Sequence, residues 1–117
     1  MKPAEIRRGQ IWSVNRTPGR GSEQRGRRPA LVIQTDAANL NPRYPNTIVL
    51  AISTKGLPVA THVQIEAGKE TGLRATSYIK GEQILTISKE RLEEYLGHTS
   101  PDILRRVETA VKLTLVL

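Results

Sequence analysis

The chain has 117 residues, no cysteine and a formal net charge of +7. This length fits one domain spanning residues 1–117, with residues 1–8 as a flexible tail, and the lack of cysteine excludes disulfides, thiol catalysis and cysteine-ligated zinc. The longest apolar runs are too short to cross a bilayer and the start has no apolar stretch of signal-peptide length, so we expect a cytoplasmic protein that does not enter a membrane.

The positive charge is concentrated in the first quarter of the chain. Residues 1–30 hold eight Lys or Arg and two Glu, whereas residues 31–117 hold ten Lys or Arg and nine Asp or Glu. A localised positive field favours polyanionic partners, of which nucleic acid is the commonest. A solvated basic segment that only aids solubility would have the same composition, so charge alone leaves both interpretations open.

Short apolar segments bounded by glycine, proline and other turn residues predict a sheet in the first three quarters of the chain. The predicted strands span residues 10–14, 28–34, 48–54 and 62–66, followed by two short strands around Gly81 within residues 77–88. Loops at 15–27 and 35–47 separate the first three strands, and the second loop includes one helical turn after Asp36. Residues 48–52 form an unbroken apolar run, which is typical of a central strand.

Two helices are expected to follow the strands. In the first, Ser88 can cap the segment KERLEEYLG. Leu92, Tyr95 and Leu96 would share one face of this helix, and Gly97 would end it.

The second helix has a complete start signal. Ser100, Pro101 and Asp102 supply a cap, a first-turn proline and a first-turn acid. Its apolar stripe at helical spacing comprises Ile103, Leu104, Val107, Ala110, Val111, Thr114 and Leu115. Strands first and helices last predict an α+β fold, with a small, strongly bent antiparallel sheet or half-open barrel and a C-terminal helix packed on it.

The residues best suited to chemistry lie in the loop that leads into the second strand. Five arginines surround one acid, Glu23: they are Arg16, Arg20, Arg25, Arg27 and Arg28. Guanidinium groups match phosphate oxygens in two contacts at once, and the glycines of this loop let the backbone approach a ligand closely. The loop therefore indicates phosphate binding. The alternative is a flexible basic loop with an internal Glu23–arginine pair and no catalytic duty.

Other reactive groups give weaker signals. His62 opens an alternating strand and His98 follows a glycine, so we expect both to be ordinary surface or turn residues. No cluster of Asp, Glu and His has metal-ligand spacing. Gly19 and Gly21 lack the strand–loop–helix context of a dinucleotide or phosphate-binding loop. We therefore expect neither a metal ion nor a cofactor.

A family resemblance covers nearly the whole chain from Gly9 onward. The segment GQIWSVNRTPGRGSEQRGRRPALVI closely resembles the opening of MazF/PemK/Kid-type toxins, in which an apolar strand is followed by G-S-E-Q, a short spacer, and R-P before a second apolar strand. The likeness continues through NTIVLAIST and SYIKGEQILTISKERL into the amphipathic C-terminal helix. It implies the SH3-like half-barrel of the MazF/PemK/CcdB-type fold.

The resemblance also implies a function. Members of this family are toxins of type II toxin–antitoxin pairs, usually metal-independent endoribonucleases that cut single-stranded RNA sequence-selectively and so inhibit translation and growth. The 2′-hydroxyl of RNA attacks the adjacent phosphate and leaves a cyclic phosphate. The family generally forms homodimers with an RNA groove across the dimer. The cognate antitoxin, expected to have an acidic disordered tail, occupies that groove.

The site residues follow from the family motif. Its catalytic arginine falls on Arg28, its glutamate on Glu23, either as base or to orient Arg28, and its threonine on Ser53. Thr54 is the alternative hydroxyl, but neighbours in an extended strand point to opposite faces, and alignment favours Ser53. The RNA-binding residues would be Arg16, Arg20, Ser22, Gln24, Arg25, Arg27, Lys55 and Gln83.

The chain departs from the family pattern at three places. Serine replaces threonine at position 53 and keeps the hydroxyl. Leu85 stands where the family usually has a basic residue, which removes an RNA contact. The insertion at residues 40–46 could reshape the groove, with Arg43 and Tyr44 as replacement contacts.

Two rival functions use the same fold. One is a poison of DNA gyrase, although the related gyrase-directed toxins lack the GSEQ and RP motif. The other is a non-catalytic basic module that binds nucleic acid.

Overall fold

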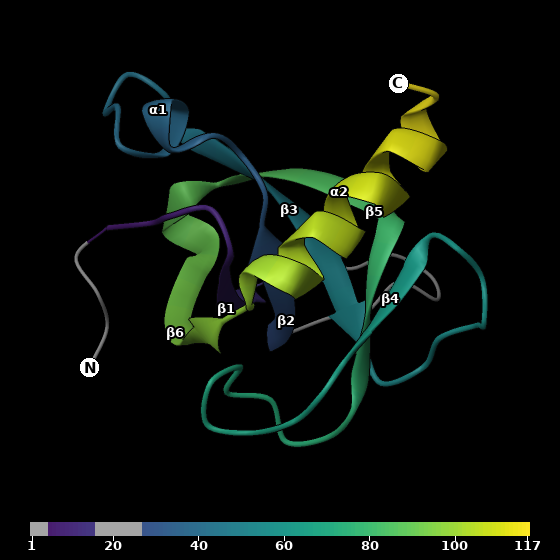
Figure 1. Cartoon of the computed structure of the whole chain (residues 1–117). Helices are drawn as coiled ribbons and strands as arrows, with labels where there is room; N and C mark the ends of the chain where they lie inside the picture. Colours follow the sequence, from purple (N-terminus) through teal and green to yellow (C-terminus); the bar gives the residue numbers. More distant parts are fainter. Residues whose placement is uncertain (1–4, 16–26) are drawn as a thin grey trace, which may run out of the picture.

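The computed structural model describes residues 5–15 and 27–117. Within them, six antiparallel strands form one sheet in the order β4-β5-β3-β2-β1-β6, confirming the α+β class (Figure 1). The strands are β1 (Gln10–Asn15), β2 (Arg27–Val32), β3 (Asn46–Ser53), β4 (His62–Ile65), β5 (Ser77–Ser88) and β6 (Leu92–His98). The helices are α1 (Asp36–Asn39), the 3-10 turn η1 (Lys89–Arg91) and α2 (Pro101–Leu115). Neither α-helix of this described part is long and apolar enough to cross a lipid bilayer.

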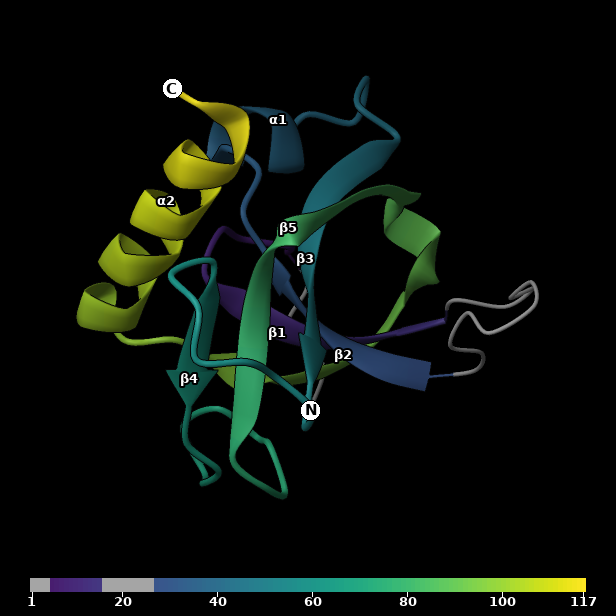
Figure 2. The same cartoon turned by 90° about the vertical axis from the view of Figure 1, so that its right-hand side faces the viewer.

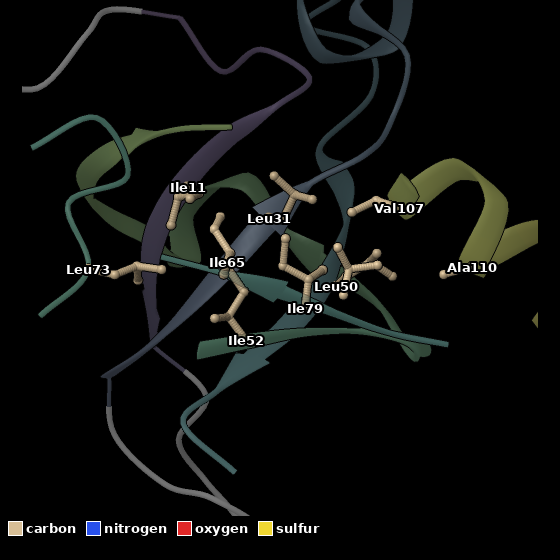
Figure 3. Packing of buried hydrophobic residues seen from close by; sticks show 10 residues of the cluster. Ile11, Leu31, Leu50, Ile52, Ile65, Leu73, Ile79, Val107 and Ala110 are labelled. Carbon is tan, nitrogen blue, oxygen red and sulfur yellow. The ribbon is translucent and has the colours of Figure 1, made fainter. Parts of the chain in front are cut away.

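The main core lies between one face of the sheet and α2, which packs on β4 and β5 (Figures 2 and 3). The strands supply most of its buried side chains, and Val107 and Ala110 enter it from α2. Its members are Ile11, Leu31, Leu50, Ile52, Val63, Ile65, Leu73, Ile79, Val107 and Ala110. Ser100 caps α2 as expected, because its Oγ accepts the N–H of Ile103 at 3.2 Å.

A second cluster fills the opposite face of the central strands. Its buried members are Trp12, Val14, Ala30, Val32, Val49 and Leu92. On the central strands they alternate with main-core residues, as Ala30 and Val32 do with Leu31. Val49 faces this cluster and Leu50 faces the main core. Both faces of β3 are therefore buried, which explains the unbroken apolar run in the sequence.

The segment expected to form the first helix is instead the edge strand β6, and this prediction was wrong. Ser88 does cap the turn η1, since its Oγ accepts the N–H of Glu90. The chain then pairs with β1 through two register shifts, so that Trp12 lies opposite Tyr95 and Val14 opposite Leu92. Each shift adds one residue to β6, which puts Leu92 and Tyr95 against the same cluster although they are three residues apart.

Contact with the loop before β5 fixes the path of β6. A Cβ atom on Gly97 would lie 2.2 Å from the carbonyl oxygen of Glu70, so only glycine fits there. Trp12 and Tyr95 pack edge to face with their ring centroids 5.8 Å apart. With β6 in this position, the edge of β1 is covered. Gly97 allows the close approach to the backbone of Glu70 and does not end a helix.

The predicted pair of strands around Gly81 is one continuous strand, β5. Its register to β3 shifts between the pair Leu50–Ile84 and the pair Ile52–Ile79. At the shift, the N–H of Gly81 donates to the carbonyl of Thr61 at 2.8 Å. The sheet bends at this point, as the expected half-barrel requires.

Of the predicted tail, the structure describes residues 5–8, and Arg8 anchors this part to the rest of the fold. The N–H of Arg8 donates to Asp36 Oδ1 at 2.7 Å, and its guanidinium donates to the carbonyl of Ile33 and to Glu108 Oε2. Asp36 is the first residue of α1, the single turn expected in this loop. The hydrogen bond from the Arg8 backbone is the main reason that the pKa of Asp36 is lowered.

Candidate active site

Pairing between β2 and β3 brings the two main candidate residues together. Ala30 lies opposite Ala51 and Leu31 opposite Leu50 in this antiparallel ladder. Continuing the same register by two residues sets Arg28 opposite Ser53, on the face away from the main core. Side chains in such positions are direct neighbours, whereas Thr54 would face Arg27 on the other side. The register therefore supports Ser53 over Thr54 as the partner of Arg28.

A pocket of about 280 Å³ opens at this position. Its walls are Arg28, Pro29, Ile52, Ser53, Thr54, Lys55 and Ser77. Within the described residues, the side chains of Arg28 and Lys55 have no hydrogen-bond or ion-pair partner, and no carboxylate lines the pocket. Two exposed cations beside a small polar hollow are suited to hold a phosphate group.

The Ser53 hydroxyl is oriented by its own turn. Its Oγ accepts the backbone N–H of Lys55 at 3.1 Å, which turns the chain sharply after β3. Because the oxygen already accepts this bond, the hydroxyl proton is available to donate to a ligand in the pocket. Thr54 lies in the bend and is exposed. This geometry suits Ser53 to donate a hydrogen bond to a phosphate oxygen.

The other expected RNA-binding residues do not line this pocket or lie outside the described residues. Arg27 forms an ion pair with Glu93 of β6, with its Nε 3.0 Å from Oε1, and keeps 64% of its side chain exposed. Gln83 is exposed at the register shift of β5 and lies outside the pocket. Six further predicted residues lie outside the described part of the chain: Arg16, Arg20, Ser22, Glu23, Gln24 and Arg25.

The structure shows where two departures from the family pattern lie, namely Leu85 and the insertion at residues 40–46. Leu85 packs against the second cluster, so its apolar side chain serves the core. Arg43 and Tyr44 are exposed in the loop before β3, near α1 (Figure 2). The eight residues of β3 put this loop roughly 23 Å from Ser53 at strand spacing. The insertion therefore does not shape this pocket, and its contact with RNA stays a prediction.

The sequence did not indicate the pocket residue Ser77 or the burial of His62, which lies outside the pocket wall. Ser77 is buried in the pocket wall and donates its hydroxyl to the carbonyl of Ala75 at 2.9 Å. His62, expected to be an ordinary surface or turn residue, has only 7% of its side chain exposed and bonds to Glu82 on β5. Glu82 lies 20 residues from His62 in the sequence, so no local pattern signals this contact. His98 is exposed, as expected.

A larger hollow of about 530 Å³ lies elsewhere, at the start of α2. Glu66 and Glu70 line it together with Arg106. Two carboxylates there repel an anionic ligand, so the smaller pocket is the better candidate for binding a polyanion. Across the described residues, no three His, Asp or Glu side chains gather in the manner of a metal site.

Comparison with known proteins identifies the family of this chain. Residues 7–115 match the family described as PemK-like, MazF-like toxin of type II toxin–antitoxin systems. The chain is 37% identical to endoribonuclease EndoA of Bacillus subtilis (strain 168), with 96% of each chain covered. It is 38% identical to endoribonuclease MazF of Staphylococcus epidermidis, over 96% of this chain and 92% of that protein.

Solved structures show the same fold. The crystal structure of MazF from Deinococcus radiodurans superposes with a TM-score of 0.79 at 22% identity, over 98% of this chain and all of that one. An endoribonuclease from Mycobacterial species, solved in complex with its cognate antitoxin, gives 0.78 at 23% identity over 96% of both chains. From the family match and the curated relatives, the chain belongs to the PemK-like, MazF-like toxins of type II toxin–antitoxin systems.

Proposed function

We propose that this protein is the endoribonuclease of its toxin–antitoxin pair and cleaves single-stranded RNA sequence-selectively, without a metal ion, in the cytoplasm. The observation that carries the proposal is the pocket that joins Arg28, the Ser53 hydroxyl and Lys55 without any carboxylate among its described walls. Both curated relatives cited above are named endoribonucleases. The gyrase-directed and purely binding functions have no comparable support.

The proposed reaction uses the nucleophile that RNA itself carries. The 2′-oxygen attacks the adjacent phosphorus, and the bond from phosphorus to the 5′-oxygen breaks. The proton of the 2′-hydroxyl passes to a base, for which Glu23 is the candidate unless it only orients Arg28. The departing oxygen takes up a proton from solvent. The products are a 2′,3′-cyclic phosphate and a 5′-hydroxyl.

Each described residue has a role in this reaction. Arg28 donates two parallel hydrogen bonds to the non-bridging oxygens, where negative charge accumulates in the transition state. Ser53 donates a third through its free proton, and Lys55 attracts the neighbouring phosphate. Arg27 contributes to RNA binding at the rim of the site, where Glu93 already offsets part of its charge.

The proposed partners are those expected of the family. The protein forms a homodimer, and a cognate antitoxin with an acidic disordered tail competes with RNA for the same cations. A mycobacterial structural neighbour was solved with its antitoxin, which supports the existence of such a partner.

Incubating a long mixed-sequence RNA with the protein in the presence of EDTA tests the function. We expect discrete fragments that carry cyclic phosphate ends, and mapping their 5′ ends gives the cleavage sequence. Intact RNA with salt-dependent binding would favour the non-catalytic module. Inhibition of DNA supercoiling by gyrase, with intact RNA, would favour the gyrase poison. Arg28→Ala protein serves as the control for contaminating nuclease.

A further inference from the structure

The segment between β3 and β4, residues 54–61, carries part of the pocket and is weakly packed. We call it the site loop. Thr54 and Lys55 at its start line the pocket, whereas Leu57 and Val59 farther along are 60% and 45% exposed. Since its apolar side chains are not buried in a core, specific contacts must hold the loop in place.

Three contacts near its beginning restrain the site loop. Ser53 Oγ accepts the Lys55 N–H, and Gly56 packs so tightly on Tyr78 that a Cβ would lie 2.2 Å from the ring. The third contact reaches across the loop: the N–H of Leu57 donates to Nδ1 of His62 at 3.0 Å. Leu57 is only two residues from Lys55, so this bond fixes the chain immediately beyond the pocket.

The bond from Leu57 determines the tautomer of His62. Nδ1 accepts a hydrogen bond and so carries no proton, which leaves the ring proton on Nε2. The Nε2 atom lies 2.8 Å from Glu82 Oε2 and donates this proton to it in a hydrogen bond. Burial by itself raises the pKa of Glu82, but the hydrogen bond from His62, with smaller contributions from the backbone N–H of Glu82, the electrostatic attraction of His62 and the hydroxyl of Thr61, lowers it overall. The carboxylate is thus ionised at neutral pH and keeps the proton on Nε2.

We propose that His62 is a positioning residue of the active site that acts through the site loop, and that Glu82 fixes the tautomer in which Nδ1 can accept a hydrogen bond. Its Nδ1 restrains Leu57, and the restrained loop presents Lys55 to the phosphate of the RNA. His62 itself does not touch the substrate. The proposal rests on the proposed function of the pocket, because it explains how one wall of that pocket is kept in place.

Two substitutions of His62 separate its two hydrogen bonds. The Oδ1 atom of Asn is attached to Cγ as Nδ1 is, so His62→Asn keeps an acceptor for the Leu57 N–H and loses the contact with Glu82. The longer His62→Gln reaches toward Glu82 with its Nε2 donor and loses the acceptor for Leu57. His98→Gln is the matched control, because His98 is an exposed histidine outside the site loop.

The readouts are kcat and KM for cleavage of an RNA oligonucleotide, Tm, and the exchange of the Leu57 amide proton with water by NMR. We expect His62→Gln to speed this exchange and to raise KM about tenfold, whereas His62→Asn stays close to wild type in both. His98→Gln should change neither. The increase in KM should vanish when Lys55→Ala is already present, because His62 acts through Lys55.

The outcomes distinguish the positioning role from simple stabilisation and from failure of the proposed function. The positioning role would be overturned if KM rose equally in the Asn and Gln variants. It would also be overturned if His62→Gln raised KM by the same factor with Lys55 and with Lys55→Ala. If wild-type protein cuts no RNA, the proposed function fails. The positioning role is then tested by binding of an oligonucleotide with 2′-deoxy substitution, because binding involves Lys55 but requires no cleavage. Equal affinities of the two His62 variants for this oligonucleotide would refute the positioning role.

Discussion

Replacing Ser53 with alanine tests the register argument for the active site. The change removes the hydroxyl donor opposite Arg28 and leaves the strand pairing of β3 intact. One preorganised donor to a developing oxyanion is typically worth a factor of about 10² to 10³ in rate. Ser53 is half-buried and Lys55 beside it is exposed, so water can replace part of the lost bond. We therefore expect a decrease in kcat of about 10², at the lower end of that range.

The same substitution has a small structural cost that can be measured separately. It also removes the acceptor for the Lys55 N–H, a bond that contributes about 0.5–1 kcal/mol at an exposed position. For a chain of this length, that loss lowers Tm by about 2–4 °C. A protein that is still folded well above the assay temperature and yet nearly inactive therefore reports the loss of catalysis rather than of folding.

The assay is single-turnover cleavage of a fluorescent oligonucleotide that contains the mapped cleavage sequence. Thr54→Ala is the matched comparison, and we expect it to slow cleavage only a few-fold because Thr54 lies in the bend. Ser53→Thr, which restores the family hydroxyl, should retain most of the activity. A larger decrease in kcat for Thr54→Ala than for Ser53→Ala would refute the register argument.

Arg28→Ala should reduce kcat by about 10² to 10³ and leave Tm unchanged, and Arg28→Lys should recover little because a point charge cannot form the paired contacts; near wild-type cleavage by either would contradict the site. In fluorescence titrations, RNA affinity should fall by about 0.7 log unit per log unit of salt for each phosphate neutralised, and Arg27→Ala should weaken binding of RNA and of an acidic antitoxin peptide together. A peptide unaffected by that change would argue against a shared groove. The lowered pKa of Asp36 stabilises the fold above the ordinary carboxyl pKa, and this contribution is lost as pH falls through the folded-state value, so Tm of wild type should fall more steeply on acidification than Tm of Asp36→Asn. Parallel Tm curves for the two proteins between pH 7 and pH 2.5 would show that Asp36 does not contribute.

Local signals in the sequence were sufficient for much of the fold. The helix α2 begins where Ser100 and Pro101 predict it, because a cap and a first-turn proline act within one turn of chain. The strand β6 was mistaken for a helix because its bulges space Leu92 and Tyr95 three residues apart, as a helix would. A bulge depends on the partner strand β1, which no pattern within the segment contains.

In the site, too, local signals identify residues but not the contacts that depend on distant segments. Arg28 and Ser53 could be named from the family motif, but their apposition depends on the register between β2 and β3. His62 was undervalued because its partners, the backbone N–H of Leu57 and the carboxylate of Glu82, come from two other segments. A backbone donor is present at nearly every residue, so the sequence cannot indicate which one a histidine will bind.

Burial of the central strands on both faces has a consequence for how target choice can evolve. Arg28 and Ser53 lie near the ends of β2 and β3, and the central residues of these strands are buried in the two clusters. The site loop, in contrast, is mostly exposed. Substitutions at its exposed positions cost little folding free energy, so the loop can diversify freely around a fixed pair of reacting groups. We expect homologous toxins to differ in the RNA sequence they cut more readily than in the bond they break.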